Sequence, residues 1–203
     1  MMRCWLASVL GLCLLTVACQ GEGDQPTNEV AATPLATSLA LPTAAGDPTI
    51  TDSQFDFPAK GYSVRIPEGW SPKPNITGTA ALTVDAFFSP SEEEEAGVQP
   101  NISVMCEAIM EETSLDAYFE GKRDLMRRIT GAEPEVAEIE VSGQQAFAME
   151  YSRTMNEPLA DYTDVIFVNE KCAWTIRLLV PRGQRSTYEA TLNEFIASFR
   201  LLP

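Results

Sequence analysis

The second half of the chain, and part of the first, alternates apolar and polar residues in short runs. Residues 62–66 follow this pattern, which predicts a half-buried β-strand. Two further strands are expected over residues 80–88 and 101–110. The side chains expected to lie on one face are Leu82, Val84, Ala86 and Phe88 in the first of these strands, and Ile102, Val104, Cys106 and Ala108 in the second.

Two hairpins are predicted beyond residue 135. The first joins residues 136–141 to 145–154 through a Ser-Gly turn at 142–143, and the second joins 162–168 to 172–180. The side chains expected to point together are Phe147, Met149 and Tyr151 in one strand, and Cys172, Trp174, Ile176 and Leu178 in another.

Two segments have helical periodicity. The first is expected to start at a capping box formed by Thr113 and Asp116 and to end at Gly131. The second is expected to start at Ser186, whose box partner would be Glu189. The apolar stripes are Leu115, Tyr118, Phe119, Leu125, Met126 and Ile129 in the first, and Tyr188, Leu192, Phe195, Ile196 and Phe199 in the second. Hairpins with two helices predict an α+β fold, a largely antiparallel sheet flanked by helices.

The N-terminus has a different pattern, that of an export signal. Arg3 precedes an apolar run of about 15 residues, shorter than the roughly 20 that a membrane-spanning helix needs, and polar residues follow from Gln20 onward. Small residues stand just before Cys19. We therefore expect residues 1–18 to be a cleaved signal peptide.

Residues 15–19, Leu-Thr-Val-Ala-Cys, resemble the lipobox of bacterial lipoproteins. Thr16 departs from the usual leucine, whereas Val17 and Ala18 fit the pattern. The resemblance implies that Cys19 is lipidated through its sulfur, becomes the first mature residue and holds the protein on the extracytoplasmic face of the cell membrane. The alternative is an ordinary signal peptide that releases a soluble protein.

Residues 19–53 are rich in Ala, Thr and Pro and poor in large apolar side chains. Such a segment has little to offset the entropy of ordering, so we expect a disordered tether. Residues 54–203 then form a single domain.

Charge and histidine content narrow the function. The formal net charge is -15, and a chain without residues 1–18 would have 13 basic and 29 acidic residues. Such a chain repels nucleic acid. Histidine is absent, which removes the commonest general base near neutral pH and the commonest ligand of transition metals. We expect no cofactor.

Cys106 and Cys172 are the two cysteines that remain after Cys4 and Cys13 leave with the signal and Cys19 takes the lipid. An even number of cysteines in an oxidising compartment suggests a disulfide. The alternative is a pair of buried, reduced thiols.

Four segments, in their order along the chain, resemble PsbP-type domains over residues 54–203. They are Gly-Tyr-Ser-Val-Arg-Ile-Pro-Glu-Gly-Trp at 61–70, Ser-Leu-Asp-Ala-Tyr at 114–118, Ser-Gly-Gln-Gln-Ala at 142–146 and Ile-Ala-Ser-Phe at 196–199. The resemblance implies an α/β/α sandwich. Members include photosystem accessory proteins, a Ran-binding protein and bacterial lipoproteins. The metal sites proposed for some members use histidine, so no site residue is transferred here.

The densest negative charge lies at residues 91–95, Ser-Glu-Glu-Glu-Glu. This segment lacks the residue order and the glycine of a calcium loop, so we expect a solvated loop. The alternative is a calcium or magnesium site.

The sequence predicts a non-catalytic interaction or assembly module with a protein partner. The alternative is a carboxylate-based hydrolase or a metal-dependent enzyme, which would bring carboxylates together in a pocket.

Overall fold

The computed structural model describes residues 47–203, except 80–81, 96, 110–112, 155–158 and 171. The predicted signal peptide at 1–18, the lipidation site Cys19 and the predicted tether up to residue 46 lie outside the described residues. Neither α-helix in the described part of the chain combines the length and the apolar content needed to cross a bilayer.

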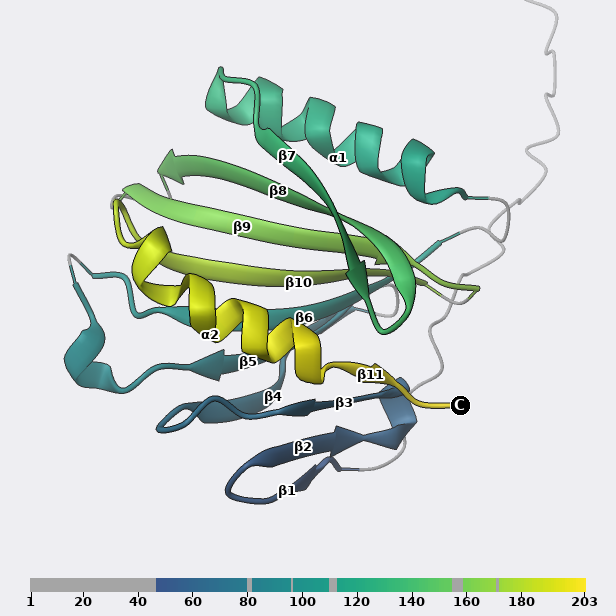
Figure 1. Cartoon of the computed structure of the whole chain (residues 1–203), viewed down its shortest axis with the longest axis vertical. Coiled ribbons are helices and arrows are strands. Elements are labelled where there is room, and N and C mark those ends of the chain that lie inside the picture. Colours follow the sequence, from purple (N-terminus) through teal and green to yellow (C-terminus); the bar gives the residue numbers. More distant parts are fainter. Residues whose placement is uncertain (1–46, 80–81, 96, 110–112, 155–158, 171) are drawn as a thin grey trace, which may run out of the picture. The chain divides into compact units, whose positions relative to one another are not determined.

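Seven strands form an antiparallel sheet (Figure 1). From one edge to the other they are β4 (Ser71–Thr79), β5 (Leu82–Phe88), β6 (Asn101–Ala108), β10 (Cys172–Pro181), β9 (Leu159–Val168), β8 (Gln144–Thr154) and β7 (Glu135–Val141). The two predicted hairpins are confirmed as β7–β8 and β9–β10. Ser142 and Gly143 both have positive φ, of 53° and 79°, which the tight β7–β8 turn requires.

Four short strands form a second sheet, also antiparallel. In order they are β1 (Thr49–Ile50), β2 (Gln54–Phe57), β3 (Tyr62–Arg65) and β11 (Arg200–Leu201). Strand β1 lies inside the range that the sequence assigned to the tether, so the predicted boundary at residue 53 is too late. The composition of this segment did not reveal β1, because the strand is held by backbone pairing with β2 and buries little apolar surface. Ile50 stays 46% exposed.

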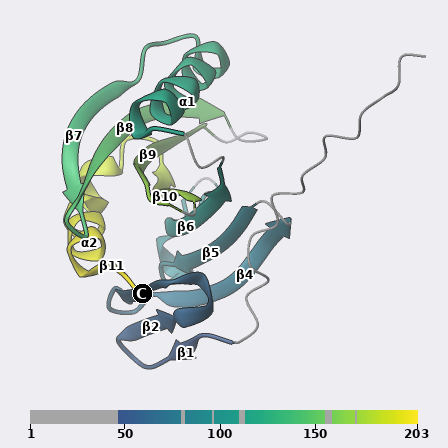
Figure 2. The same cartoon turned by 90° about the vertical axis from the view of Figure 1, so that its right-hand side faces the viewer.

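The two helices pack on opposite faces of the seven-stranded sheet (Figure 2). Helix α1 (Leu115–Thr130) packs on β8 and β9, and helix α2 (Arg185–Ser198) packs on β10 and β3. Side chains along β9 alternate between the two sides, since Val165 belongs to the α2-side core and Ile166 to the α1-side core. The predicted α+β fold, a sheet between helices, is confirmed.

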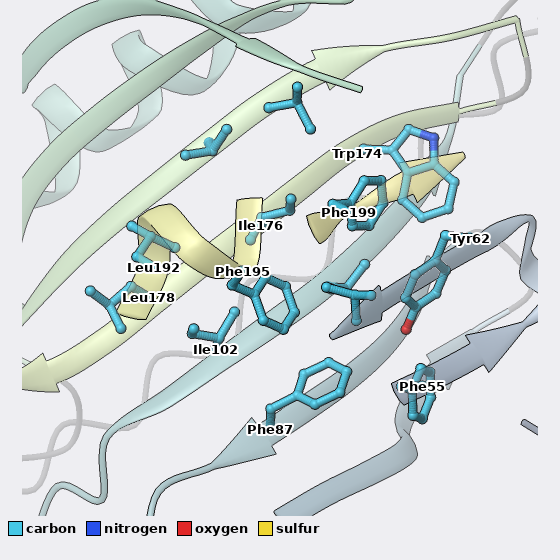
Figure 3. Close-up of a cluster of buried hydrophobic side chains, with 14 of the residues drawn as sticks. Phe55, Tyr62, Phe87, Ile102, Trp174, Ile176, Leu178, Leu192, Phe195 and Phe199 are labelled. Carbon is cyan, nitrogen blue, oxygen red and sulfur yellow. The ribbon is translucent and has the colours of Figure 1, made fainter. Parts of the chain in front are cut away.

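The larger core lies between α2, the two sheets and the disulfide. Aromatic rings fill much of it: Tyr62 stacks on Phe199 at 5.4 Å between centroids, and Phe87 meets Phe195 edge-on at 5.0 Å (Figure 3). The predicted stripe of α2 is confirmed as a packing face, because Leu192 and Phe195 are buried here.

Two features of the strands were not predicted. Phe87, not its neighbours Ala86 and Phe88, points into the larger core, since α2 and the small sheet cover that side of β5. Strand β4 was not predicted, because Pro72 and Pro74 cannot donate backbone hydrogen bonds. It forms nonetheless because it is an edge strand, with an irregularity between Lys73 and Thr77.

The helix starts also differ from the predicted capping boxes. Helix α1 is capped by Ser114, whose Oγ accepts from the backbone N of Ala117 at 3.2 Å, so Thr113 is not the cap. Helix α2 follows Gln184, which makes no side-chain cap bond, so Ser186 lies inside the first turn. The predicted end of α1 at Gly131, with φ of 72°, is confirmed.

Candidate functional site

A groove runs between α2 and the sheet and forms a hollow of about 590 Å³. We call it the α2 groove. Strands β7 to β10 and the turn before α2 supply its floor and sides. Its lining residues are Ile139, Ala148, Glu150, Asp161, Thr163, Val165, Leu178, Gly183, Arg185, Ser186, Glu189, Leu192, Asn193 and Ile196.

The α2 groove has a polar end and an apolar end. Along α2 the lining changes from Arg185, Ser186 and Glu189 to Leu192 and Ile196. The strands below follow the same order: on β9 from Asp161 and Thr163 to Val165, and on β8 from Glu150 to Ala148. The groove can therefore hold a ligand that is polar at one end and apolar at the other.

Asp161 is a fixed feature of the polar end. Its side chain accepts hydrogen bonds from Ser152 Oγ at 2.5 Å and from the backbone N of Gly183 at 2.7 Å. Asp161 is 7% exposed, and its two hydrogen bonds hold the carboxylate in place. It thereby positions the turn that leads into α2.

Arg185 forms one wall of the polar end. Its Nη1 donates to Glu150 Oε2 at 3.0 Å, and its Nη2 donates to the backbone oxygens of Tyr151 and Tyr162 at 3.1 and 3.4 Å. Its Nε is buried and has no hydrogen-bond partner among the described residues. The Nε–H donor of this guanidinium is therefore unpaired in the described structure.

Thr163 lies on the floor of the groove, opposite Leu178 on β10 and Glu150 on β8. The residue is 5% exposed, and its Oγ1 finds no hydrogen-bond partner in the described structure. Buried hydroxyls are nearly always bonded, and an unsatisfied one carries a desolvation cost of about 1–3 kcal/mol. A group that enters the groove and bonds to this hydroxyl would relieve that cost.

A smaller hollow adjoins the α2 groove at each end. One hollow shares Glu150 and Arg185 with the groove and is also lined by Glu133, Glu135, Thr130, Ala132, Tyr151 and Ser152. The other shares Ile196 and is also lined by Glu140, Ser142, Gly143, Ala197 and Arg200. The depression is therefore elongated, which suits an extended chain better than a compact small molecule.

The acidic segment 91–95 packs against α2. Its first part is a short 3₁₀ turn, η2 (Ser91–Glu93). Glu93 accepts from Tyr188 Oη at 3.0 Å, and Glu95 accepts from Gln184 Nε2. Burial and the bond to Glu93 raise the pKa of Tyr188 to about 12. The four glutamates are exposed, but this loop also fixes the start of α2.

The alternative of a metal site in this segment gains no support. Among the described residues, no three Asp, Glu or Cys side chains are grouped so that they could hold a metal ion. In the α2 groove, Glu150 is tied to Arg185, and Asp161 to Ser152 and Gly183. These carboxylates are held by protein donors.

The structure joins Cys106 and Cys172 in a disulfide, so the first of the two alternatives is confirmed. Their Cα atoms lie 5.8 Å apart on neighbouring strands, with Trp174 directly opposite Cys106. A small cavity of about 110 Å³ borders the bridge, and Trp174 Nε1 is buried beside it without a hydrogen-bond partner in the described structure. The bridge ties β6 to β10 within the core.

The sequence did not single out the α2 groove as a binding site. Among its lining residues, only capping or packing roles were predicted, for Leu178, Ser186, Glu189, Leu192 and Ile196. The one available signal is in β9, where Asp161, Thr163 and Asp164 interrupt an otherwise apolar strand. Asp164 lies on the opposite face of the sheet, paired with Arg177 at 2.6 Å and accepting from Tyr151 at 3.0 Å. Burial and this carboxylate raise the pKa of Tyr151. The polar residues of β9 therefore lie on both faces of the sheet: Asp161 and Thr163 face the groove, and Asp164 faces the other side.

No protein-family model and no curated protein sequence matches the chain. Solved structures do resemble it. The cyanobacterial PsbP protein of Synechocystis is 15% identical, with a TM-score of 0.54 over 79% of this chain and 99% of that one. A Bacteroides thetaiotaomicron protein is 14% identical, with a TM-score of 0.52 over 76% of this chain, and this chain spans only 50% of its length.

A third similar structure is a Pseudomonas aeruginosa protein of unknown function, 12% identical, with a TM-score of 0.51 over 70% of this chain and 90% of that one. At such identities the likeness shows the fold alone. The PsbP-like fold that the sequence predicted is thereby confirmed.

Proposed function

We propose that the protein is an extracytoplasmic lipoprotein, anchored by lipid on Cys19, whose PsbP-like domain binds a partner protein in the α2 groove without catalysing a reaction. The observation that carries the binding role is the Thr163 hydroxyl, buried at the floor of an open groove and left without a partner in the described structure.

Two features support the compartment. The resemblance of residues 15–19 to a lipobox follows a short apolar run with a positive start. The Cys106–Cys172 disulfide is typical of an oxidising compartment. A lipid anchor followed by residues 20–46 would leave the domain free to meet partners beside the membrane.

The groove carboxylates support a binding role over a catalytic one. A general acid or base must reach substrate, but Glu150 is engaged by Arg185 and Asp161 by two donors. These bonds hold the two carboxylates at fixed positions in a surface that a partner can recognise.

The anchor is tested by mass spectrometry of the protein purified from its own membrane. We expect a first residue Cys19 that carries a diacylglycerol thioether, and a Cys19→Ala variant that lacks it. Recovery of wild-type protein with an unmodified first residue would remove the anchor from the proposal.

The binding role is tested by photo-crosslinking in cells. A benzophenone amino acid in place of Asn193, which lines the groove, should give a discrete crosslinked product, whereas the same substitution at Glu120, on exposed α1, should not. Ser186→Arg, which fills the polar end from an exposed helix position, should abolish the product. Equal crosslinking from both positions would contradict a partner site in the groove.

A further inference from the structure

The charges around the α2 groove point to a cationic ligand. The groove and its two adjoining hollows are lined by six carboxylates and two guanidinium groups. The carboxylates are Glu133, Glu135, Glu140, Glu150, Asp161 and Glu189, and the guanidinium groups are Arg185 and Arg200. Glu133 is also paired with Arg123 and Arg127 of α1, but the surface keeps an excess of negative charge that repels anions.

The two unsatisfied groups set what the ligand must offer. Arg185 Nε can only donate, so it needs an acceptor such as a carbonyl oxygen. Thr163 Oγ1 can accept, so it suits an N–H donor, and the carboxylates of Asp161 and Glu189, which line the same groove, favour a positive one. A simple amine supplies the donor but not the acceptor. A peptide with a basic side chain supplies both.

The apolar end suits the stem of such a side chain. Ile139, Leu192 and Ile196 line it, and Ile139 and Ile196 remain partly exposed. Lysine side chains lay their methylene groups along apolar surface and keep the ammonium in a polar setting. The order of apolar and polar residues along the groove matches that arrangement.

We infer that the α2 groove binds an extended, lysine-bearing peptide segment of its partner protein. The lysine ammonium donates to Thr163 Oγ1 beside Asp161 and Glu189, and a peptide carbonyl accepts from Arg185 Nε. This inference rests on the proposed function, since it names the partner chemistry of the same groove.

The test uses the purified lipoprotein in detergent and three probes: acetyl-Leu-Lys-Leu-Lys-Leu-amide, its glutamate counterpart and 1,5-diaminopentane. We expect the lysine peptide to bind and to shift the backbone amide resonances of Thr163 and Leu192. The glutamate peptide should bind at least about tenfold more weakly, because its charge is repelled. The diamine should also bind at least about tenfold more weakly, because it lacks the carbonyl.

Three variants locate the binding. Thr163→Val keeps the shape, removes the hydroxyl and should weaken peptide binding by about fivefold while leaving the fold at least as stable. Glu189→Gln should weaken binding by about threefold. Glu194→Gln, an exposed glutamate on the same helix that lines no part of the groove, should leave the Kd within about twofold.

Three outcomes of the peptide-binding experiments would overturn the inference: no binding of the lysine peptide at millimolar concentration, equal effects of Glu189→Gln and Glu194→Gln, or equal binding of the diamine. The last would assign the groove to free polyamines instead. The proposed function fails separately, because crosslinking from position 193 does not depend on the charge of the partner. A crosslinked partner that binds the groove through an acidic or neutral segment would support the proposed partner-binding function and contradict the inferred lysine-bearing segment.

Discussion

The ammonium of Lys60 lies 2.6 Å from Oδ1 of Asp85, and the two side chains are 4% and 2% exposed. Lys60 ends the short 3₁₀ turn η1 (Pro58–Lys60) before β3, whereas Asp85 lies on β5. The Asp85 carboxylate also accepts from Tyr62 Oη at 2.7 Å and from the backbone N of Asn75 at 2.8 Å. One buried carboxylate thus joins the small sheet to the large one.

Removing one member of this buried pair should be costly. Asp85→Ala leaves the Lys60 ammonium buried without its partner, so we expect a loss of about 3–5 kcal/mol in the free energy of unfolding. Urea denaturation measures it. The double variant Lys60→Met/Asp85→Leu should lose less than either single change, because no unpaired charge remains.

A matched surface pair provides the control. Asp124→Ala breaks the exposed pair with Arg127 on α1, where both side chains are at least half exposed, and should change stability by no more than about 0.5 kcal/mol. Similar losses at Asp85 and Asp124 would contradict the bridging role of Asp85.

Loss of the Cys106–Cys172 disulfide should destabilise the domain. The bridge closes a loop between residues 66 apart, worth about 4 kcal/mol in the chain-entropy account. Thermal unfolding in a buffer that contains a phosphine reductant should therefore give a lower Tm than unfolding in the same buffer without it. The Cys106→Ala/Cys172→Ala variant should melt at the same temperature in both buffers, and reductant-insensitive melting of the wild type would argue against the bridge.

The two helix starts should respond differently to the same substitution. Ser114→Ala removes the cap bond to Ala117 N and should cost about 1 kcal/mol. Ser186→Ala removes no cap bond, because α2 follows Gln184, and should be nearly neutral. Chemical denaturation of both variants compares them directly, and a larger loss at Ser186 would restore the capping box that the sequence predicted.

Glu107 should make the stability of α1 packing depend on pH. Burial opposes its ionisation, but bonds from Lys122 at 2.8 Å and Tyr118 at 2.6 Å outweigh this and lower its pKa below the ordinary value of 4.5. A carboxyl whose folded pKa is lowered adds stability above its unfolded pKa, and that stability is lost as pH falls through the folded pKa.

Glu107→Gln should therefore be less stable than wild type at pH 7, by less than about 1 kcal/mol because the pair is partly exposed. The difference should shrink as the pH is lowered below 4.5. Denaturation at several pH values follows the difference, with Glu120→Gln, from an exposed pair with Arg123, as a control. A stability difference between wild type and Glu107→Gln that grows as the pH falls would contradict a lowered pKa for Glu107.

Local patterns predicted most elements correctly. Strands and hairpins follow from the two-residue side-chain period and from the Ser142-Gly143 turn, and the end of α1 follows from Gly131. These features depend on residues a few positions apart, which the chain order already fixes.

The sequence by itself determined most strands and both helices, because their side-chain periods are encoded within a few neighbouring residues, and the order of these elements along the chain then indicated the class of fold. Only the tertiary structure decided which side of β5 faces the core, that Pro72 and Pro74 lie in an edge strand, and that Cys106 meets Cys172. The same holds for the α2 groove, whose lining spans residues 139 to 196 on separate elements. Strand register and helix docking bring such side chains together, and both depend on contacts between residues far apart in the chain.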